Sequence, residues 1–229
     1  MMKRRLVKNI FSDRSSLVLR ALLREPEKKW TLPDLAKEGV SLGLASDVLS
    51  KAEAQGYVER AVRGPASYSR LIRKEDLLKD WLNAYSFERN DHAYYLNTDK
   101  DFLKNCARYL SQRKTVFALT LYSASRLVSP YVKDDRHFIY LDLGREEFAG
   151  FLKQIEARLN LYKLVQGGNT CFILPFYRSS VFKELIKIKR YPVVSHLQLY
   201  LDLMTFPPTG PEEAQHLISY FKKKGLFFV

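Results

Sequence analysis

The stretch SLGLASDVLSKAEAQGYVERAVRGPASYSRL, which runs from Ser41 to Leu71, decides how the first part of the chain folds. It opens on Ser41, a residue type that caps helix N-termini. Apolar residues then recur at helical spacing, and Gly56 follows them where a helix usually ends in a left-handed residue. The pattern predicts a helix that begins after Ser41, ends before Gly56 and buries Ala45, Val48, Leu49 and Ala52.

A short β-hairpin is predicted directly after this helix. Residues 57–60 and 68–72 are β-prone and flank a turn at Gly64-Pro65. Arginines lie on both strands and beside the turn, so the tip of the hairpin is basic. A helix followed at once by a short hairpin with a basic tip is typical of the recognition helix and wing of a winged helix-turn-helix.

The residues before Ser41 can supply the rest of such a domain. Residues 13–24 are amphipathic and predict a first helix. Residues 30–31 suit the short strand that winged helices place before their second helix, and residues 32–38 suit that second helix. We therefore predict a winged helix-turn-helix over residues 1–73.

Two surfaces of this domain are candidates for contact with DNA. The helix face opposite the apolar residues carries small and hydroxyl-bearing side chains, which allow close approach to a groove and hydrogen bonds to base edges or phosphates. The wing supplies arginines for backbone or minor-groove contacts. Asp47 shares the helix face; phosphate would repel it, although its carboxylate could accept a hydrogen bond from a cytosine amino group. The predicted DNA-binding residues are Ser41, Leu42, Gly43, Ser46, Ser50, Lys51, Arg60, Arg63, Ser67, Tyr68 and Arg70.

The charge of the chain favours a polyanionic partner, since 38 Lys and Arg residues outnumber 25 Asp and Glu residues. Residues 1–80 carry 17 of the basic and 11 of the acidic residues, so the positive charge is spread over both halves. Contact with DNA by both halves, binding to RNA and binding to an acidic protein all remain open. A winged helix that serves protein contacts is a further alternative.

Beyond residue 97, apolar β-prone runs alternate with amphipathic helical segments. This alternation predicts an α/β domain over residues 98–229, joined to the first domain by a connecting helix and linker at residues 74–97. A Gly-Gly-Asn turn predicts a hairpin over residues 161–175, so the sheet should be mixed. The fold class is thus α+β or α/β, with a winged helix-turn-helix followed by a larger mixed-sheet domain. The predicted strands are residues 115–122, 137–142, 161–165, 170–175 and 186–190.

No catalytic, metal-binding or cofactor-binding pattern stands out, and we predict none. The sequence lacks phosphate-binding glycine loops, a nucleophile elbow and HExxH or CxxC motifs, and its four histidines lack metal-ligand spacing. Asp142, Glu146 and Glu147 follow a predicted strand, where a metal-dependent nuclease keeps carboxylates. The alternative function is therefore a nucleic-acid-processing enzyme, a nuclease or nucleotidyltransferase with a winged-helix targeting domain.

The two cysteines, Cys106 and Cys171, form neither a metal pattern nor a disulfide framework. No apolar run is long enough to cross a bilayer, and the basic start lacks the apolar region of a secretion signal. We expect a cytoplasmic protein with reduced thiols and no membrane partner.

Three stretches carry a family resemblance: VSLGLASDVLSKAEAQGYVER at residues 40–60, ALTLYSASRL at 118–127 and VVSHLQLYLDLMTFPPTGPEEAQHL at 193–217. Together they resemble the AbiEi-family antitoxins, the transcriptional regulators of type IV toxin–antitoxin (AbiE) systems. The resemblance implies a winged helix followed by a larger α/β antitoxin domain. It also implies two partners: double-stranded DNA at the system's own promoter, giving autorepression, and a nucleotidyltransferase-type toxin that is opposed without a stable complex.

On the matching residues, the resemblance places DNA contacts in residues 41–51 and 60–70. It gives a structural role to Gln198, Tyr200 and Asp202 in the C-terminal stretch. The predicted function is a sequence-specific DNA-binding transcriptional regulator of antitoxin type, a repressor and not an enzyme.

Overall fold

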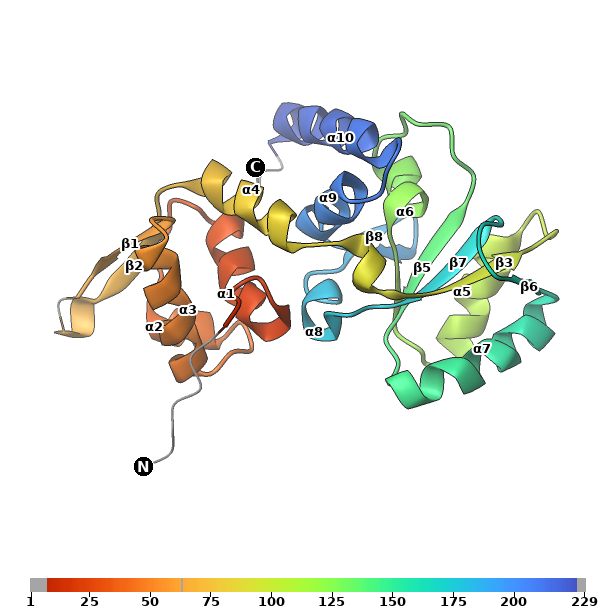
Figure 1. Ribbon diagram of the computed structural model, residues 1–229, viewed down its shortest axis with the longest axis horizontal. Coiled ribbons are helices and arrows are strands. Elements are labelled where there is room, and N and C mark those ends of the chain that lie inside the picture. The colour runs from red at the N-terminus through yellow and green to blue at the C-terminus, as the bar shows by residue number, and fades with distance from the viewer. Residues whose placement is uncertain (1–7, 63, 226–229) are drawn as a thin grey trace. The chain divides into compact units, whose positions relative to one another are not determined.

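The computed structural model describes residues 8–62 and 64–225 of the chain (Figure 1). These residues form two compact units. The first comprises residues 8–85 together with residues 221–225, and the second comprises residues 86–220. Helices dominate the first unit and a large mixed sheet the second, so the fold class is mixed α+β.

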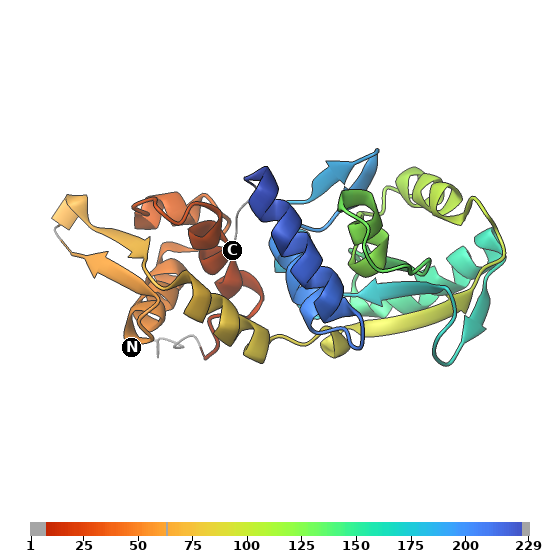
Figure 2. The ribbon, with the colours of Figure 1, turned by 90° about the horizontal axis from the view of Figure 1, so that it is seen from above.

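The first unit combines helices with a two-stranded antiparallel hairpin. Figures 1 and 2 show the hairpin projecting past the helices of its unit. The backbone N–H groups of Trp30 and Ser69 each donate to the other's carbonyl at 2.8 Å, so the strand predicted at residues 30–31 is present as a bridge to the hairpin. The elements in order are α1 (Asp13–Arg24), α2 (Leu32–Ala36), α3 (Leu42–Ala54), β1 (Val58–Ala61), the 3₁₀ helix η1 (Gly64–Ala66), β2 (Tyr68–Leu71) and α4 (Lys74–Ala84).

Local sequence accounts for the bounds of α3. The Ser41 hydroxyl accepts a hydrogen bond from the Leu44 N–H at 3.2 Å, which satisfies one of the free donors at the helix N-terminus. After the helix, Gly56 adopts a left-handed backbone with φ of +78°, a conformation that costs other residues free energy. The predicted helix and its buried side are confirmed, because the structure buries Ala45, Val48, Leu49 and Ala52.

A seven-stranded mixed sheet organises the second unit, in the order β6-β3-β7-β5-β4-β9-β8. Its neighbours are antiparallel except for the parallel pairs β5–β7 and β4–β9. The elements are η2 (Phe87–Arg89), β3 (Asp91–Leu96), α5 (Phe102–Gln112), β4 (Phe117–Leu119), α6 (Leu121–Val128), β5 (His137–Leu141), α7 (Arg145–Leu159), β6 (Tyr162–Leu164), β7 (Thr170–Leu174), α8 (Arg178–Val181), β8 (Ile186–Ile188), β9 (Tyr191–Val193), α9 (His196–Met204) and α10 (Gly210–Lys224).

Helices cover both faces of this sheet (Figure 1). Successive residues of a strand point to opposite faces. On one face, the Tyr95 hydroxyl of β3 donates to Glu156 of α7 at 2.7 Å. On the other face, the Tyr140 hydroxyl of β5 donates to Asp202 of α9 at 3.2 Å.

The Asp202 carboxylate is fully buried and is held by hydrogen bonds. Besides Tyr140, it accepts from the amide nitrogen of Gln198 at 2.8 Å and from the hydroxyl of Thr120. These contacts join α9 to the residue that follows β4 and to β5. A buried carboxylate is tolerated only when its oxygens find donors, so this part of the C-terminal stretch holds the sheet and helix together.

The hairpin predicted over residues 161–175 is wrong. Strands β6 and β7 do not pair with each other; β3 lies between them and pairs antiparallel with both. Residues 91–96, treated as linker in the sequence analysis, are thus a strand inside the sheet. The segment that connects β6 to β7 passes over the end of β3. A Cβ on Gly168 of this segment would lie 2.3 Å from the Tyr95 carbonyl oxygen. The Asn169 side chain completes this contact by accepting from the Asn97 N–H at 2.9 Å.

Two further expectations are corrected. The strand predicted over residues 115–122 covers only Phe117–Leu119, because α6 already begins at Leu121. The strand predicted over residues 186–190 is shorter and pairs with β9, which the sequence analysis did not predict. Strand β9 was missed because it is only three residues long and because Pro192, its middle residue, interrupts the β-prone pattern.

Candidate nucleic-acid interface

The N-terminal turn of α3 is open to solvent. Ser41 caps the helix, and Leu42 and Gly43 follow it as exposed residues, with Leu42 52% exposed. A Cβ built on Gly43 would meet no atom within 4 Å, so the described protein leaves the space in front of this residue open. Another molecule can therefore reach the backbone at this end of the helix.

The next two turns carry one predicted serine each, and the two serines differ in their contacts. The Ser50 hydroxyl donates to the Ser46 carbonyl at 2.9 Å and accepts from Nη1 of Arg60 at 2.7 Å. The Ser46 hydroxyl makes no hydrogen bond within the described chain, whereas the Lys51 ammonium donates to the Lys8 carbonyl at 3.2 Å. Asp47 is half-buried on the same helix. Of the two serines, Ser46 has the hydroxyl available for a ligand.

The wing arginines pair with acidic residues. Arg70 donates from Nε and Nη2 to one carboxylate oxygen of Glu59, its direct partner across the hairpin, at 2.9 and 2.8 Å. Arg60 lies 3.8 Å from the Glu53 carboxylate of α3. An exposed ion pair such as that of Arg70 with Glu59 contributes about 1 kcal/mol or less, so a phosphate can replace the carboxylate at little cost. Arg63, also predicted to bind DNA, lies outside the described residues.

The remaining predicted wing residues are Ser67 and Tyr68. The Ser67 hydroxyl donates to the Gly64 carbonyl at 2.7 Å and so stabilises the turn. The Tyr68 ring lies 4.8 Å from the ammonium of Lys29, an exposed residue that the sequence analysis did not single out. The basic pair Lys28-Lys29 lies directly before Trp30 in the sequence, and this pattern could have identified Lys29 as a candidate.

The acidic residues considered for nuclease chemistry have structural partners. Asp142 accepts a hydrogen bond from Arg178, and the Glu147 carboxylate accepts from the Gly144 N–H at 2.9 Å, which caps α7. Glu146 lies in the first turn of the same helix. Among the residues that the structure describes, no three His, Cys, Asp or Glu side chains come together as metal ligands.

The two cysteine side chains of the second unit are buried and its histidines are half-buried. Burial raises the pKa of the Cys171 thiol to about 12 and that of Cys106 further, so both stay protonated at neutral pH. Burial also lowers the pKa of His137 to about 4, with the nearby Arg126 acting in the same direction. These groups are neutral in the native protein at neutral pH.

The chain is thus a mixed α+β protein in which a helical unit with a projecting hairpin accompanies a larger unit built on a mixed sheet. A family model described as "Transcriptional regulator, AbiEi antitoxin, Type IV TA system" matches residues 70–221. The chain belongs to this family. Comparisons with curated proteins and with solved structures found no match. Over the ranges that could be described, every helix is too short or too polar to span a membrane.

Proposed function

We propose that the protein is a sequence-specific DNA-binding regulator of antitoxin type and that its first unit is a winged helix-turn-helix. The observation that carries this proposal is the connection between α3 and the hairpin. The first turn of α3 and Ser50 are exposed, and the Arg60 side chain of β1 reaches back to the helix at Ser50. A recognition helix and a basic wing joined in this way can contact adjacent parts of one DNA duplex.

In this function, α3 enters the major groove and the hairpin follows the phosphate backbone. Small residues at the start of α3 permit close approach, and Ser46 supplies a free hydroxyl to a base edge. Arg60 and Arg70 exchange their carboxylate partners for phosphates. Arg60 and Arg70 then provide affinity for any sequence, while α3 and the deformability of the DNA provide specificity.

The family supports a wider role in a type IV toxin–antitoxin system. We propose that the protein represses its own promoter and opposes a nucleotidyltransferase-type toxin without forming a stable complex with it. A nucleotidyltransferase gene directly downstream would supply that toxin. Co-expression of the protein with this toxin should restore the growth of cells that the toxin alone inhibits. Size-exclusion chromatography of the two proteins should give separate peaks. A shared peak, or growth that is not restored, contradicts this role.

The DNA-binding proposal is tested by a mobility shift with the gene's own upstream DNA across a salt series. Specific binding should persist in excess competitor DNA and weaken steeply with salt. Arg60→Ala and Arg70→Ala should each weaken binding to all sequences and reduce the salt slope by about 1. The matched control is Lys79→Ala, which removes an exposed charge of α4. It should change neither the affinity for DNA nor the salt slope.

Three results would overturn the proposal. Binding that competitor DNA removes completely would exclude sequence specificity. Binding that does not respond to salt would exclude phosphate contacts. Equal effects of Lys79→Ala and the two wing substitutions would show that the wing has no special part in binding.

A further inference from the structure

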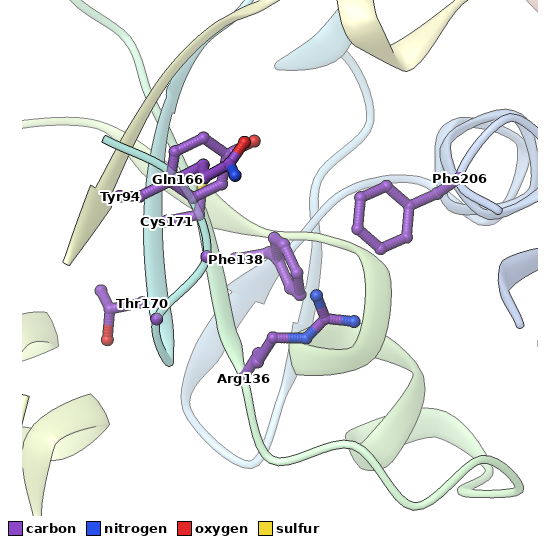
Figure 3. A pocket seen from close by; sticks show the side chains of 9 residues that line it. Tyr94, Arg136, Phe138, Gln166, Thr170, Cys171 and Phe206 are labelled. Carbon is purple, nitrogen blue, oxygen red and sulfur yellow. The ribbon is translucent and has the colours of Figure 1, made fainter. Parts of the chain in front are cut away.

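The second unit contains a cavity of about 290 Å³ on the side of the sheet that α9 covers (Figure 3). Its floor is a row of three side chains on adjacent strands. Tyr94 of β3 lies opposite Cys171 of β7, and Phe138 of β5 lies opposite the same cysteine. Residues paired in this way point to the same face of a sheet, so two aromatic rings flank a buried thiol. Phe206, which follows α9, lines the cavity as a third ring.

Arg136 supplies the charge of this cavity. Its Nε donates to both carboxylate oxygens of Asp134, at 3.1 and 3.0 Å, and its Nη2 donates to one of them at 2.6 Å. Its guanidinium carbon lies 5.3 Å from the centre of the Phe138 ring and 5.6 Å from that of Phe206. The guanidinium is therefore held in place on one edge by a carboxylate and stacked among rings.

One edge of the Arg136 guanidinium has no hydrogen-bond partner among the described residues. Nη1 makes no hydrogen bond to any residue that the structure describes, and the side chain is 41% exposed. In Figure 3 its terminal nitrogens lie on the side of Phe138 and Phe206. The hydrogen bonds to Asp134 raise the pKa of Arg136, so the group stays charged. A fixed cation with a free edge among aromatic rings is arranged to receive an acceptor oxygen.

The Tyr94 hydroxyl, the Gln166 amide, the Thr170 hydroxyl and the Cys171 thiol are the other polar side-chain groups of the lining. The Thr170 hydroxyl accepts from the Asn97 amide at 2.6 Å, and burial keeps the Cys171 thiol protonated. Gly167 and Gly168 bound the cavity where the chain passes over the end of β3, with φ of +77° and +79°. They contribute backbone but no side chain to the lining.

We propose that this cavity is a binding site for a small planar aromatic molecule that carries a carboxylate or similar anionic oxygen. The ring lies against Tyr94, Phe138 and Phe206, and the anionic oxygen accepts from Nη1 of Arg136. Ligand sites of proteins are mostly apolar with one or two placed polar groups, and about 300 Å³ is the lower end of their volumes, which suits one or two rings. This site is separate from the proposed DNA contacts and would give the regulator a small-molecule ligand.

Binding is tested on the full chain with cinnamate, a planar aromatic carboxylate, and with cinnamyl alcohol, its neutral counterpart. Isothermal titration should show cinnamate binding at least tenfold more tightly than the alcohol, since a charged hydrogen bond is worth about 1.5–3 kcal/mol. Arg136→Met keeps the length of the side chain and should remove that preference. Arg145→Met removes an exposed arginine of the same unit, paired with Asp91 at 2.8 Å, and should leave it intact.

A second measurement does not depend on the variants folding. In amide NMR spectra of the wild-type chain, cinnamate should shift the signals of Gly167, Gly168 and Cys171 most. Equal affinity for the two probes, an unchanged preference in a folded Arg136→Met variant, or shifts located away from this cavity would each overturn the proposal.

Discussion

Arg60 donates a hydrogen bond from Nη1 to the Ser50 hydroxyl at 2.7 Å, which connects the first strand of the hairpin to the exposed face of α3. This contact engages the Ser50 oxygen. The Ser46 hydroxyl, in contrast, makes no hydrogen bond within the described chain. The two serines, equivalent in the sequence, are therefore expected to contribute differently to DNA binding.

We expect Ser46→Ala to change sequence preference and Ser50→Ala to change affinity. Loss of the Ser46 hydroxyl removes a base contact and should cost about 1 kcal/mol on the best sequence only. Loss of the Ser50 hydroxyl releases Arg60 and should alter binding to all sequences alike. Binding to a panel of single-base operator variants separates the two; parallel shifts for both serines would contradict the assignment.

Glu59 competes with DNA for Arg70, so Glu59→Gln should strengthen DNA binding. The substitution breaks an exposed ion pair and frees the guanidinium, which predicts an increase in affinity of about two- to fivefold at low salt. Glu75→Gln, at an exposed residue of α4, makes the same change in net charge outside the hairpin. Fluorescence anisotropy should show the increase in DNA affinity for Glu59→Gln alone. An equal increase in both variants would mean that net charge, and not the release of Arg70, causes it.

The buried Asp202 should be essential for stability. Asp202→Ala leaves the hydroxyls of Thr120 and Tyr140 and the Gln198 amide without their acceptor, which predicts a loss of about 3 kcal/mol or more in the free energy of unfolding. Asp202→Asn keeps one acceptor oxygen and should cost less. Denaturant titration measures both, with the exposed Asp101→Ala as control; a loss under about 1 kcal/mol for Asp202→Ala would contradict this role.

The passage of the chain over β3 predicts unequal costs for two adjacent glycines. Gly167→Ala places a Cβ in open space at positive φ and should cost about 1 kcal/mol. Gly168→Ala adds a collision with the Tyr95 carbonyl, which would lie 2.3 Å away, and should cost several times more. Thermal unfolding of the two variants measures the difference. Equal costs would be inconsistent with β3 lying between β6 and β7.

Acid should destabilise the second unit through His137. Burial lowers the pKa of this histidine from about 6.5 in the unfolded chain to about 4 in the native protein. Between these values the unfolded state binds more protons, so stability is full above pH 6.5 and falls as the pH drops towards 4. His137→Gln removes this proton uptake and should flatten the decline in unfolding free energy measured over that range. An unchanged slope would assign the decline to other groups.

Much of the local structure and one side of the candidate interface could be predicted from the sequence. Helix α3, its Ser41 cap, its buried side and the Gly56 terminus all follow from residues close together in the chain. The polar face of that helix follows from the same periodicity. The ion pair of Arg70 with Glu59 could not be predicted in this way, because it depends on the register of the hairpin.

By itself, the sequence determined helix α3 with its Ser41 cap, the positive charge and the resemblance to a family of regulators. Only the tertiary structure decided which strands pair, that β3 separates β6 from β7, and that Tyr94, Phe138 and Arg136 meet around a cavity. The physical reason is that caps and helical periodicity act within a few residues. The backbone donors and acceptors of a strand are the same for every sequence, so its partners are chosen by packing between residues far apart in the chain.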